Sequence, residues 1–315
     1  MPSGHARIVD RVTTRLKLKQ LRLLVAVGKH GSIQYAARDL NVSQPSATKM
    51  IKDLELDFEV QLFERTNRGV VPTPFGEALI RHGKLIFAQI SNAAQELDDL
   101  NEGSSGRVVI GTLLAASSHL LPLAIEQVLQ DRPRLAIEVV EGTNEVLMPE
   151  LRSGEIDLVA GRLPTHRYRD ELTQEKLFDE RILVVAGTDH PLAGRQALAF
   201  EALKQYGWIL PPVETTLRRQ LEQFFLRQDQ YHPPFALESV SYLTNRSLLR
   251  SRDYIGLMPA QVAAQDIASG LLVQLDLTLP FGNGPVGVSY RRNGQMSPAG
   301  EAMLEALRKA AARIG

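Results

Sequence analysis

The chain has 315 residues, of which 44% are hydrophobic, and its formal net charge at neutral pH is zero. A chain of this length can bury two or three separate hydrophobic cores. The absence of cysteine excludes disulfides, thiolate zinc sites, iron-sulfur clusters and cysteine nucleophiles. The sequence has no apolar run of about 18 residues and no signal-peptide-like start, which predicts a cytoplasmic protein that does not cross a membrane.

The first part of the chain is strongly basic. Residues 1–52 contain ten Lys or Arg residues against Asp10 and Asp39, a net charge of plus eight, so the remaining 263 residues carry minus eight. A basic block joined to an acidic remainder indicates a module that binds a polyanion. A basic surface that is merely solvated is the plainer alternative.

Two helices are predicted between Leu18 and Leu40. The first has apolar residues at the spacing of one buried helical face and ends at Gly31. The second follows Ser32, whose side chain can cap it. Its adjacent alanines, Ala36 and Ala37, are small enough to let another helix cross closely. The two helices and the turn after them are typical of a helix-turn-helix motif.

The third predicted helix begins in "NVSQPSATKMIKDLE", residues 41–55. Ser43 is its expected N-cap, and Pro45 is tolerated in the first turn because its missing N–H would have no intrahelical partner. Ala47, Ile51 and Leu54 form the buried stripe. The polar residues therefore gather at the exposed N-terminal end, which in helix-turn-helix proteins enters the major groove.

A two-stranded wing is predicted from "VQLFERTNRGVVPTPFGEAL", in which Asn67 and Gly69 mark a tight turn. Arginines flank its tip, where they can reach phosphates or the minor groove. The residues expected to contact DNA are Ser32, Ser43, Gln44, Pro45, Ser46, Thr48, Lys49, Lys52, Arg65 and Arg68.

At this point the sequence resembles the LysR-type transcriptional regulators. The landmarks are "AARDLNVSQPSATKMIKDLE" followed by "LFERTNRGVVPTPFGE", in the family's order and spacing. Phe58 is expected to stand where the family usually has a helix-ending glycine, a position that does not suit a bulky side chain at positive φ. The resemblance extends from about residue 16 over nearly the whole chain. It implies an N-terminal winged helix-turn-helix domain in residues 1–73.

A long helix is predicted from Pro74 to about Leu100, preceded by Thr73 as N-cap. Its apolar residues repeat with a seven-residue period interrupted by Gly83, which is typical of a coiled-coil seam. An amphipathic helix packed on its own domain is the alternative. The resemblance implies a linker helix over residues 74–101 that pairs two subunits. The expected dimerisation residues are Leu79, Ile86, Ile90, Ala93, Leu97 and Leu100.

After the linker-like "NEGSSG", the pattern changes to short buried strands that alternate with helices. This alternation predicts an α/β region with a parallel sheet. The fold class is therefore α+β multidomain. The resemblance implies an effector-binding domain over residues 102–315, made of two subdomains like those of periplasmic binding proteins. Subdomain I is expected at about 107–163 and 278–315 and subdomain II at about 164–277, with chain crossings near 162–165 and 275–285.

Ligands of open α/β sheets bind where strand C-terminal ends and helix N-termini converge. The loops after the predicted strands supply hydroxyl, amide and guanidinium groups, which favour an organic acid anion as effector. A sugar is the alternative, and helix caps or a plain surface charge would explain the same residues without a ligand. The expected effector-binding residues are Ala115, Ser117, Ser118, Thr143, Asn144, Arg162, Thr216 and Arg218.

No catalytic, metal or cofactor site is predicted. The histidines lack ligand spacing, and no nucleophile-base pair is evident. "GNGPVG", residues 282–287, matches a dinucleotide fingerprint only as a string and is interpreted as a crossover loop. The expected function is therefore a non-enzymatic regulator. The resemblance implies binding of pseudo-palindromic double-stranded DNA, assembly as a homotetramer formed by a dimer of dimers, and contact with RNA polymerase. A small-molecule binding protein or an enzyme with a basic arm is the competing class.

Overall fold

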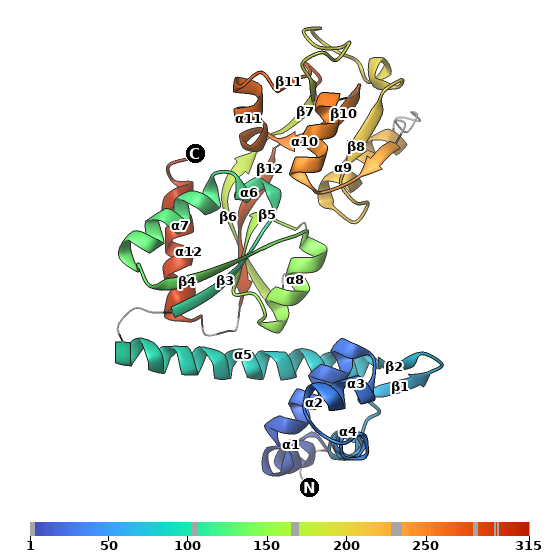
Figure 1. Cartoon of the computed structure of the whole chain (residues 1–315), viewed down its shortest axis with the longest axis vertical. Coiled ribbons are helices and arrows are strands. Elements are labelled where there is room, and N and C mark those ends of the chain that lie inside the picture. Colours follow the sequence, from blue (N-terminus) through green and yellow to red (C-terminus); the bar gives the residue numbers. More distant parts are fainter. Residues whose placement is uncertain are drawn as a thin grey trace. The chain divides into compact units, whose positions relative to one another are not determined.

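The computed structural model describes residues 4–102, 106–164, 170–227, 235–251, 253–279, 283–292, 294 and 296–314. They form two compact units (Figure 1). The first comprises Met1–Ala93 with Ser153–Glu155, and the second comprises Ala94–Arg152 with Ile156–Gly315. Among the described residues no helix is both long enough and apolar enough to cross a bilayer.

The N-terminal unit is a helical domain with a small antiparallel wing. Its elements are α1 (Gly4–Arg15), α2 (Leu18–His30), α3 (Ile33–Asp39), α4 (Gln44–Phe58), β1 (Phe63–Thr66), β2 (Gly69–Pro72) and the start of α5 (Pro74–Glu102). The predicted boundaries at Gly31, Ser32 and Ser43 are confirmed. Gly31 closes α2 at φ 60°, and the hydroxyls of Ser32 and Ser43 accept capping hydrogen bonds at the starts of α3 and α4. Helix α1 is an element that the sequence pattern did not predict.

The core of this unit forms where α2, α3 and α4 cross. Ala36 and Ala37 of α3 are buried, as the close helix crossing requires. Ala47, Ile51 and Leu54 of α4 are at most 4% exposed, which confirms the predicted stripe. Burial of this one face leaves the polar N-terminal end of α4 at the surface.

The wing is attached to the turn between α2 and α3. The Val70 amide donates to the Gly31 carbonyl at 2.9 Å. Gly69 has a φ of 137°, and a Cβ atom there would lie 2.3 Å from the Gly31 oxygen. Only glycine fits this approach, so Gly69 both turns the chain and brings the wing against the helices.

The corner between α4 and the wing corrects one expectation. Phe58 is the last helical residue of α4, and its partly buried ring packs on the core. The left-handed conformation, at φ 58°, falls on Glu59. The helix-ending position was therefore placed one residue too early, because the left-handed residue follows the last helical one.

The described residues of the second unit form two five-stranded sheets. The first has the order β4-β3-β5-β12-β6. Its strands are β3 (Gly106–Thr112), β4 (Leu135–Glu141), β5 (Leu158–Arg162), β6 (Leu172–Glu180) and β12 (Gly284–Arg291). Strands β3, β4 and β5 are parallel, whereas β12 runs antiparallel to both β5 and β6. The predicted parallel sheet is thus a mixed one.

Helices cover both faces of this first sheet. They are α6 (Leu114–Ser117), α7 (Leu120–Asp131), α8 (Asn144–Ser153) and α12 (Pro298–Ala311). Helices α7 and α12 pack on one face and α8 on the other (Figure 1). The main core therefore joins residues from the middle and the end of the chain.

The second sheet has the order β11-β7-β10-β8-β9. Its strands are β7 (Ile182–Gly187), β8 (Gly207–Leu210), β9 (Phe235–Glu238), β10 (Tyr254–Pro259) and β11 (Leu272–Gln274). The 3₁₀ helix η1 (Phe200–Leu203) and α9 (Thr216–Arg227) pack on the face that buries Trp208. Helices α10 (Tyr242–Ser251) and α11 (Ala260–Ala268) cover the other face.

The crossing from the first sheet to the second differs from the expected one. Strand β6 pairs with β12 in the first sheet, so the chain passes over at Arg181, between β6 and β7, and not near 162–165. Residues 172–180 thus belong with subdomain I. The chain returns between β11 and β12, and Gly284 to Gly287 begin a strand instead of forming a loop. Gly282 lies outside the described residues.

Two glycines of α5 make a matched test of the N-terminal unit. A Cβ on Gly76 would meet the Leu62 carbonyl oxygen at 2.0 Å, whereas a Cβ on Gly83 would meet side-chain methyls alone, of Val25 at 3.2 Å and Leu21 at 3.9 Å. We expect Gly76→Ala to destabilise the unit by about 1–3 kcal/mol, because backbone must move. Gly83→Ala should change its stability by less than about 1 kcal/mol, since alanine also favours the helix.

Urea unfolding of the full chain separates the two units. Trp208 is the only tryptophan and lies in the core of the second unit. Its fluorescence should keep its midpoint in Gly76→Ala, while circular dichroism gains an earlier transition. Equal losses of stability for the two variants would contradict the steric argument.

Candidate functional site

The N-terminal end of α4 forms an exposed polar surface. The Ser43 hydroxyl accepts from the Ser46 amide at 3.4 Å and donates to the Ser46 hydroxyl at 2.9 Å. Five of the residues expected to contact DNA line one shallow hollow here: Gln44, Pro45, Thr48, Lys49 and Lys52. Because the opposite face of α4 is buried, these side chains are free to meet a partner outside the domain.

The other three residues of the expected DNA-contacting set lie on α3 and the wing. Ser32 caps α3 by accepting from the Tyr35 amide at 3.4 Å. Arg65 lies opposite Val70 in the wing, and Arg68 is in the turn between the strands. Within the described ranges neither guanidinium forms an ion pair, and both are exposed. Exposed arginines of this kind are suited to phosphate.

Helix α5 exposes part of the expected dimerisation seam. Ile86, Ile90 and Leu97 are 39%, 45% and 61% exposed. Leu79 instead packs, partly buried, against the core of the N-terminal unit. Ala93 is exposed, and the side chain of Leu100 lies outside the described residues. The apolar seam that this chain leaves uncovered therefore begins at Ile86.

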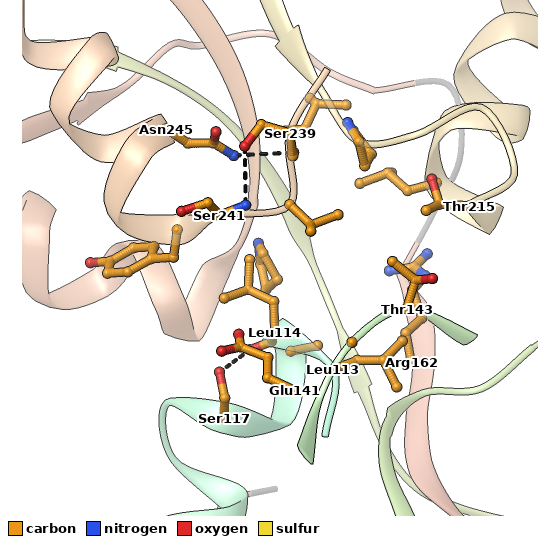
Figure 2. A pocket seen from close by; sticks show the side chains of 18 of the residues that line it. Leu113, Leu114, Ser117, Glu141, Thr143, Arg162, Thr215, Ser239, Ser241 and Asn245 are labelled. Carbon is orange, nitrogen blue, oxygen red and sulfur yellow. Dashed lines mark hydrogen bonds between the residues drawn. The ribbon is translucent and has the colours of Figure 1, made fainter. Parts of the chain in front are cut away.

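A cavity of about 620 Å³ lies in the second unit and is lined by residues from both sheets (Figure 2). Its walls are formed by the loops after β3, β4 and β5 and by the starts of helices in the second subdomain. Six of the eight predicted effector-binding residues line it: Ala115, Ser117, Thr143, Asn144, Arg162 and Thr216. Ser118 and Arg218 do not.

Arg218 has a different place. Its Nε donates to Glu222 at 2.8 Å and its Nη1 donates to the Pro211 carbonyl at 3.3 Å. These bonds hold the guanidinium between α9 and the strand end that precedes it. Ser118 follows the short helix α6 and is exposed. Being near a helix start was thus not sufficient to put either side chain into the cavity.

Arg162 brings a largely buried positive charge to the cavity. It ends β5, and the Asn144 side-chain amide donates to its carbonyl at 3.0 Å. A Cβ on Gly284 would lie 2.0 Å from its Cζ, so the guanidinium rests directly on the β12 backbone. Its Nη1 is buried and has no hydrogen-bond partner among the described residues. A buried donor left unpaired costs about 1–3 kcal/mol, which a bound acceptor would recover.

Glu180 is the carboxylate that acts electrostatically on Arg162. It is 2% exposed and lies where the chain leaves the first sheet, and its Oε1 accepts from the Gln261 amide at 3.0 Å. Burial raises the pKa of Glu180, and the bonds from the α11 amides oppose this rise. Burial lowers the pKa of Arg162, and the charge of Glu180 partly offsets it. Arg162 and Glu180 thus end β5 and β6, the two strands that pair with the start of β12 on either side.

The second subdomain contributes two helix N-termini. The Thr215 hydroxyl accepts from the Arg218 amide at 3.4 Å at the start of α9, and the Ser241 hydroxyl accepts from the Thr244 amide at 3.4 Å at the start of α10. Helix α8 begins on the opposite wall at Asn144. Three helix N-termini around one cavity, together with a buried arginine, favour an anion.

Two carboxylates, Glu141 and Glu145, line the same cavity. Glu141 ends β4 and is exposed, and Glu145 lies in the first turn of α8. They can accept hydrogen bonds from hydroxyl or amino groups. This part of the cavity lining is therefore suited to a ligand that has hydrogen-bond donors as well as an acid group.

Many lining residues were not predicted. They include an apolar group formed by Leu113, Leu114, Ile182, Ile209, Val240, Leu243 and Leu257, and a polar group formed by Thr215, Ser239, Ser241, Tyr242 and Asn245. The hydrophobic pattern of the sequence predicts that apolar residues are buried in a core, so it cannot mark those that line a cavity. For Ser239, Ser241, Tyr242 and Asn245 the available signal was "SVSYLTN", a cap-like cluster ahead of a helix.

Tyr242 also connects two helices at the wall of the cavity, α10 and α11. Its hydroxyl donates to Asp266 at 2.7 Å, and Arg246 lies 3.0 Å from the same carboxylate. Burial, together with this bond to Asp266, raises the pKa of Tyr242 to about 12. The tyrosine thus stays protonated at neutral pH and ties α10 to α11. Within the described residues, no group of three His, Asp or Glu side chains could hold a metal ion.

Comparison with protein families identifies both units. Residues 18–77 match the bacterial regulatory helix-turn-helix protein of the lysR family, and residues 101–312 match the LysR substrate binding domain. The transcriptional regulator GbpR of Azospirillum brasilense is 33% identical over 94% of this chain and 87% of its own length. The regulator PcaQ of Agrobacterium fabrum is 30% identical over 96% of this chain and 97% of its own length.

Solved structures share the same fold. A mutant of OxyR from Corynebacterium glutamicum is 27% identical with a TM-score of 0.56, covering 96% of this chain and 95% of that one. Full-length CbnR in complex with its target DNA has a TM-score of 0.63 at 19% identity, covering 94% of this chain and all of that one. The chain belongs to the LysR family of DNA-binding transcriptional regulators, with an N-terminal helix-turn-helix domain and a C-terminal substrate-binding domain.

Proposed function

We propose that this protein reads a specific DNA sequence with the N-terminal end of α4 and is controlled by an organic acid anion in the cavity of the second unit. The observation that carries the effector proposal is Arg162, a largely buried guanidinium whose Nη1 is unpaired among the described residues. An anion that accepts from Nη1 would relieve the desolvation of this charge. The helix N-termini around the cavity act in the same direction.

A sugar is the second candidate effector. Glu141, Asn245 and Ser241 line the cavity and can form hydrogen bonds with hydroxyl groups. The Asn245 side-chain oxygen is buried and has no partner among the described residues. A hydroxylated acid would bind to Arg162 through its carboxylate and to Glu141, Ser241 and Asn245 through its hydroxyl groups. A thermal-shift screen of organic acids and sugars, each against its neutral or deoxy analogue, decides between them, since a ligand of the native state raises its melting temperature.

On the DNA side, two winged domains joined through the exposed part of α5 would read a pseudo-palindromic site. The exposed Ile86, Ile90 and Leu97 support pairing of two subunits. Assembly of two such dimers in the cytoplasm, bending of the DNA and ligand-dependent contact with RNA polymerase are parts of the same proposal. Filling of the cavity by a ligand would change the relation between its two walls and so the arrangement of the dimers.

DNase footprinting of the DNA upstream of the protein's own gene tests the regulator function. We expect protection of a defined site, with affinity that falls steeply as salt rises, because phosphate neutralisation contributes much of the binding. A small-molecule binding protein or an enzyme with a basic arm would give no defined protection at any salt concentration, with or without candidate ligands. That result would refute the proposal.

Gln44 and Arg68 should differ in their effect on DNA binding. Gln44 lies at the exposed start of α4 and can pair bidentately with adenine, whereas Arg68 in the wing turn is placed for phosphate or the minor groove. We expect Gln44→Ala to reduce discrimination between matched and mismatched sites by about 1–3 kcal/mol. Arg68→Ala should weaken binding to all sequences alike. Competition gel shifts measure both, and a uniform loss in Gln44→Ala would contradict the assignment.

Thr143 and Gly284 give two independent tests of the effector site. Thr143→Val removes a hydroxyl from the cavity at almost constant volume. Gly284→Ala displaces the Arg162 guanidinium without changing any charge. Both should weaken binding of the screened acid about tenfold, the effect of one lost hydrogen bond to a charged group. Isothermal titration measures the change.

Ser118→Ala is the matched control for these variants because Ser118 lies outside the cavity lining. DNA binding without ligand should remain in all three variants. If Gly284→Ala left the affinity for the acid unchanged, Arg162 would not be the group that binds it.

A further inference from the structure

The C-terminal end of the recognition helix α4 combines two unfavourable features. Glu59 adopts a left-handed conformation that is usually taken by glycine at this position. The last turn of α4 contains no basic residue, and Asp57 places a negative charge beside the partially negative carbonyl end of the helix. An isolated α4 would therefore fray at this end.

Helix α1 supplies the missing positive charges. Arg11 Nη2 lies 2.5 Å from Glu59 Oε1, and Arg11 Nη1 donates to the Leu56 carbonyl at 3.4 Å. One turn later, Arg15 Nη1 lies 4.0 Å from Asp57 Oδ1. The two arginines thus face the carbonyl end of α4, and Arg11 bonds both to a free carbonyl and to the left-handed residue itself. Helix α1 ends before residue 18, where the match to the helix-turn-helix family begins.

The corner at Glu59 also determines where the wing starts. The Glu59 and Val60 amides donate to the Glu55 carbonyl. The Glu55 carboxylate then accepts from the amides of Leu62 at 2.9 Å and Phe63 at 3.4 Å, at the beginning of β1. Recognition helix and wing are therefore joined by four residues, and the conformation of Glu59 sets the angle between them.

We propose that Arg11 is a positioning residue for DNA recognition. By bonding to Glu59 and to the carbonyl end of α4, it stabilises the left-handed corner and so orients the wing relative to the recognition helix. Arg11 needs no contact with DNA for this role. Helix α1 then contributes to DNA binding by orienting the wing, although it lies outside the residues that match the family.

Amide hydrogen exchange in the full-length protein tests this role without any DNA. The variants are Arg11→Ala, Glu59→Gly and the double variant. Arg11→Ala should speed exchange at Val60 and Leu62 about three- to fivefold, the scale of one partly exposed ion pair. In the Glu59→Gly background the same change should have an effect below about twofold, because glycine adopts positive φ without strain.

Arg15→Ala is the matched control on the same helix, since Arg15 is 69% exposed in its side chain and only 4.0 Å from its partner. It should alter exchange at the corner less than Arg11→Ala does. Equal acceleration by Arg11→Ala in the wild-type and Glu59→Gly backgrounds would overturn the proposal, as would no acceleration at all. Unchanged circular dichroism verifies that the variants fold.

DNA affinity is the functional readout, and only this part depends on the proposed function. On the footprinted site, Arg11→Ala should bind several-fold more weakly, and addition of Glu59→Gly should restore the affinity. Restoration shows that Arg11 acts through the corner. Persistent weak binding in the double variant, with exchange at the corner restored, would mean that Arg11 contacts DNA directly and would refute the positioning role.

Discussion

A largely buried guanidinium at the end of β5, the central strand of the first sheet, is the constraint around which the cavity of the second unit is built. Arg162 is largely shielded from water, rests on a glycine backbone and is balanced only in part by Glu180. Burial of an incompletely paired charge is costly, so it persists only where the surrounding structure prevents its escape. Here the β12 backbone beneath it and Asn144 beside it provide that restraint. The cavity that faces Arg162 is consequently prepared for a partner of opposite charge.

The location of this charge would connect the proposed effector binding to the architecture. Glu180 ends the last strand before the chain passes to the second sheet, and Gly284 begins the strand on which it returns. Both connections therefore lie within the neighbourhood of Arg162. An anion bound to Arg162, as proposed, would weaken the attraction between Arg162 and Glu180 and so alter the electrostatic balance where the chain passes between the two subdomains. Under the proposed function, this would be a physical route from ligand binding to a change in the relation between the two subdomains.

Much of the N-terminal unit could be predicted from the sequence because its signals are local. Ala47, Ile51 and Leu54 have helical spacing, and Ser43 and Gly31 are typical boundary residues. The position of the left-handed residue was missed by one, since composition alone does not say which of Phe58 and Glu59 leaves the helix. Helix α1 was missed because its stabilising arginine contacts join residues more than forty positions apart.

The second unit was harder to predict because its organisation depends on distant pairing. Strand β6 is an edge strand, and its polar sequence "LTQEKLFDE" lacks the apolar run that marks buried strands. Its true partner, β12, lies more than a hundred residues away. Arg162 was predicted because it follows a buried strand. The apolar cavity residues were not, because burial in a core and exposure to a ligand give the same pattern.

The return of the chain to the first sheet has a consequence for biosynthesis. Strand β12 completes that sheet between β5 and β6, and Arg308 of α12 forms a bidentate ion pair with Glu175, 133 positions earlier. While the ribosome is still making residues 284–311, one face of the parallel strands β3, β4 and β5 is covered by α7 without α12, and β5 lacks its neighbour β12. The second sheet, contained within residues 182–274, can close before this point. The first subdomain therefore begins to emerge before the second but completes its fold after it, and until β12 is made the open edge of β5 is exposed to pairing with other chains.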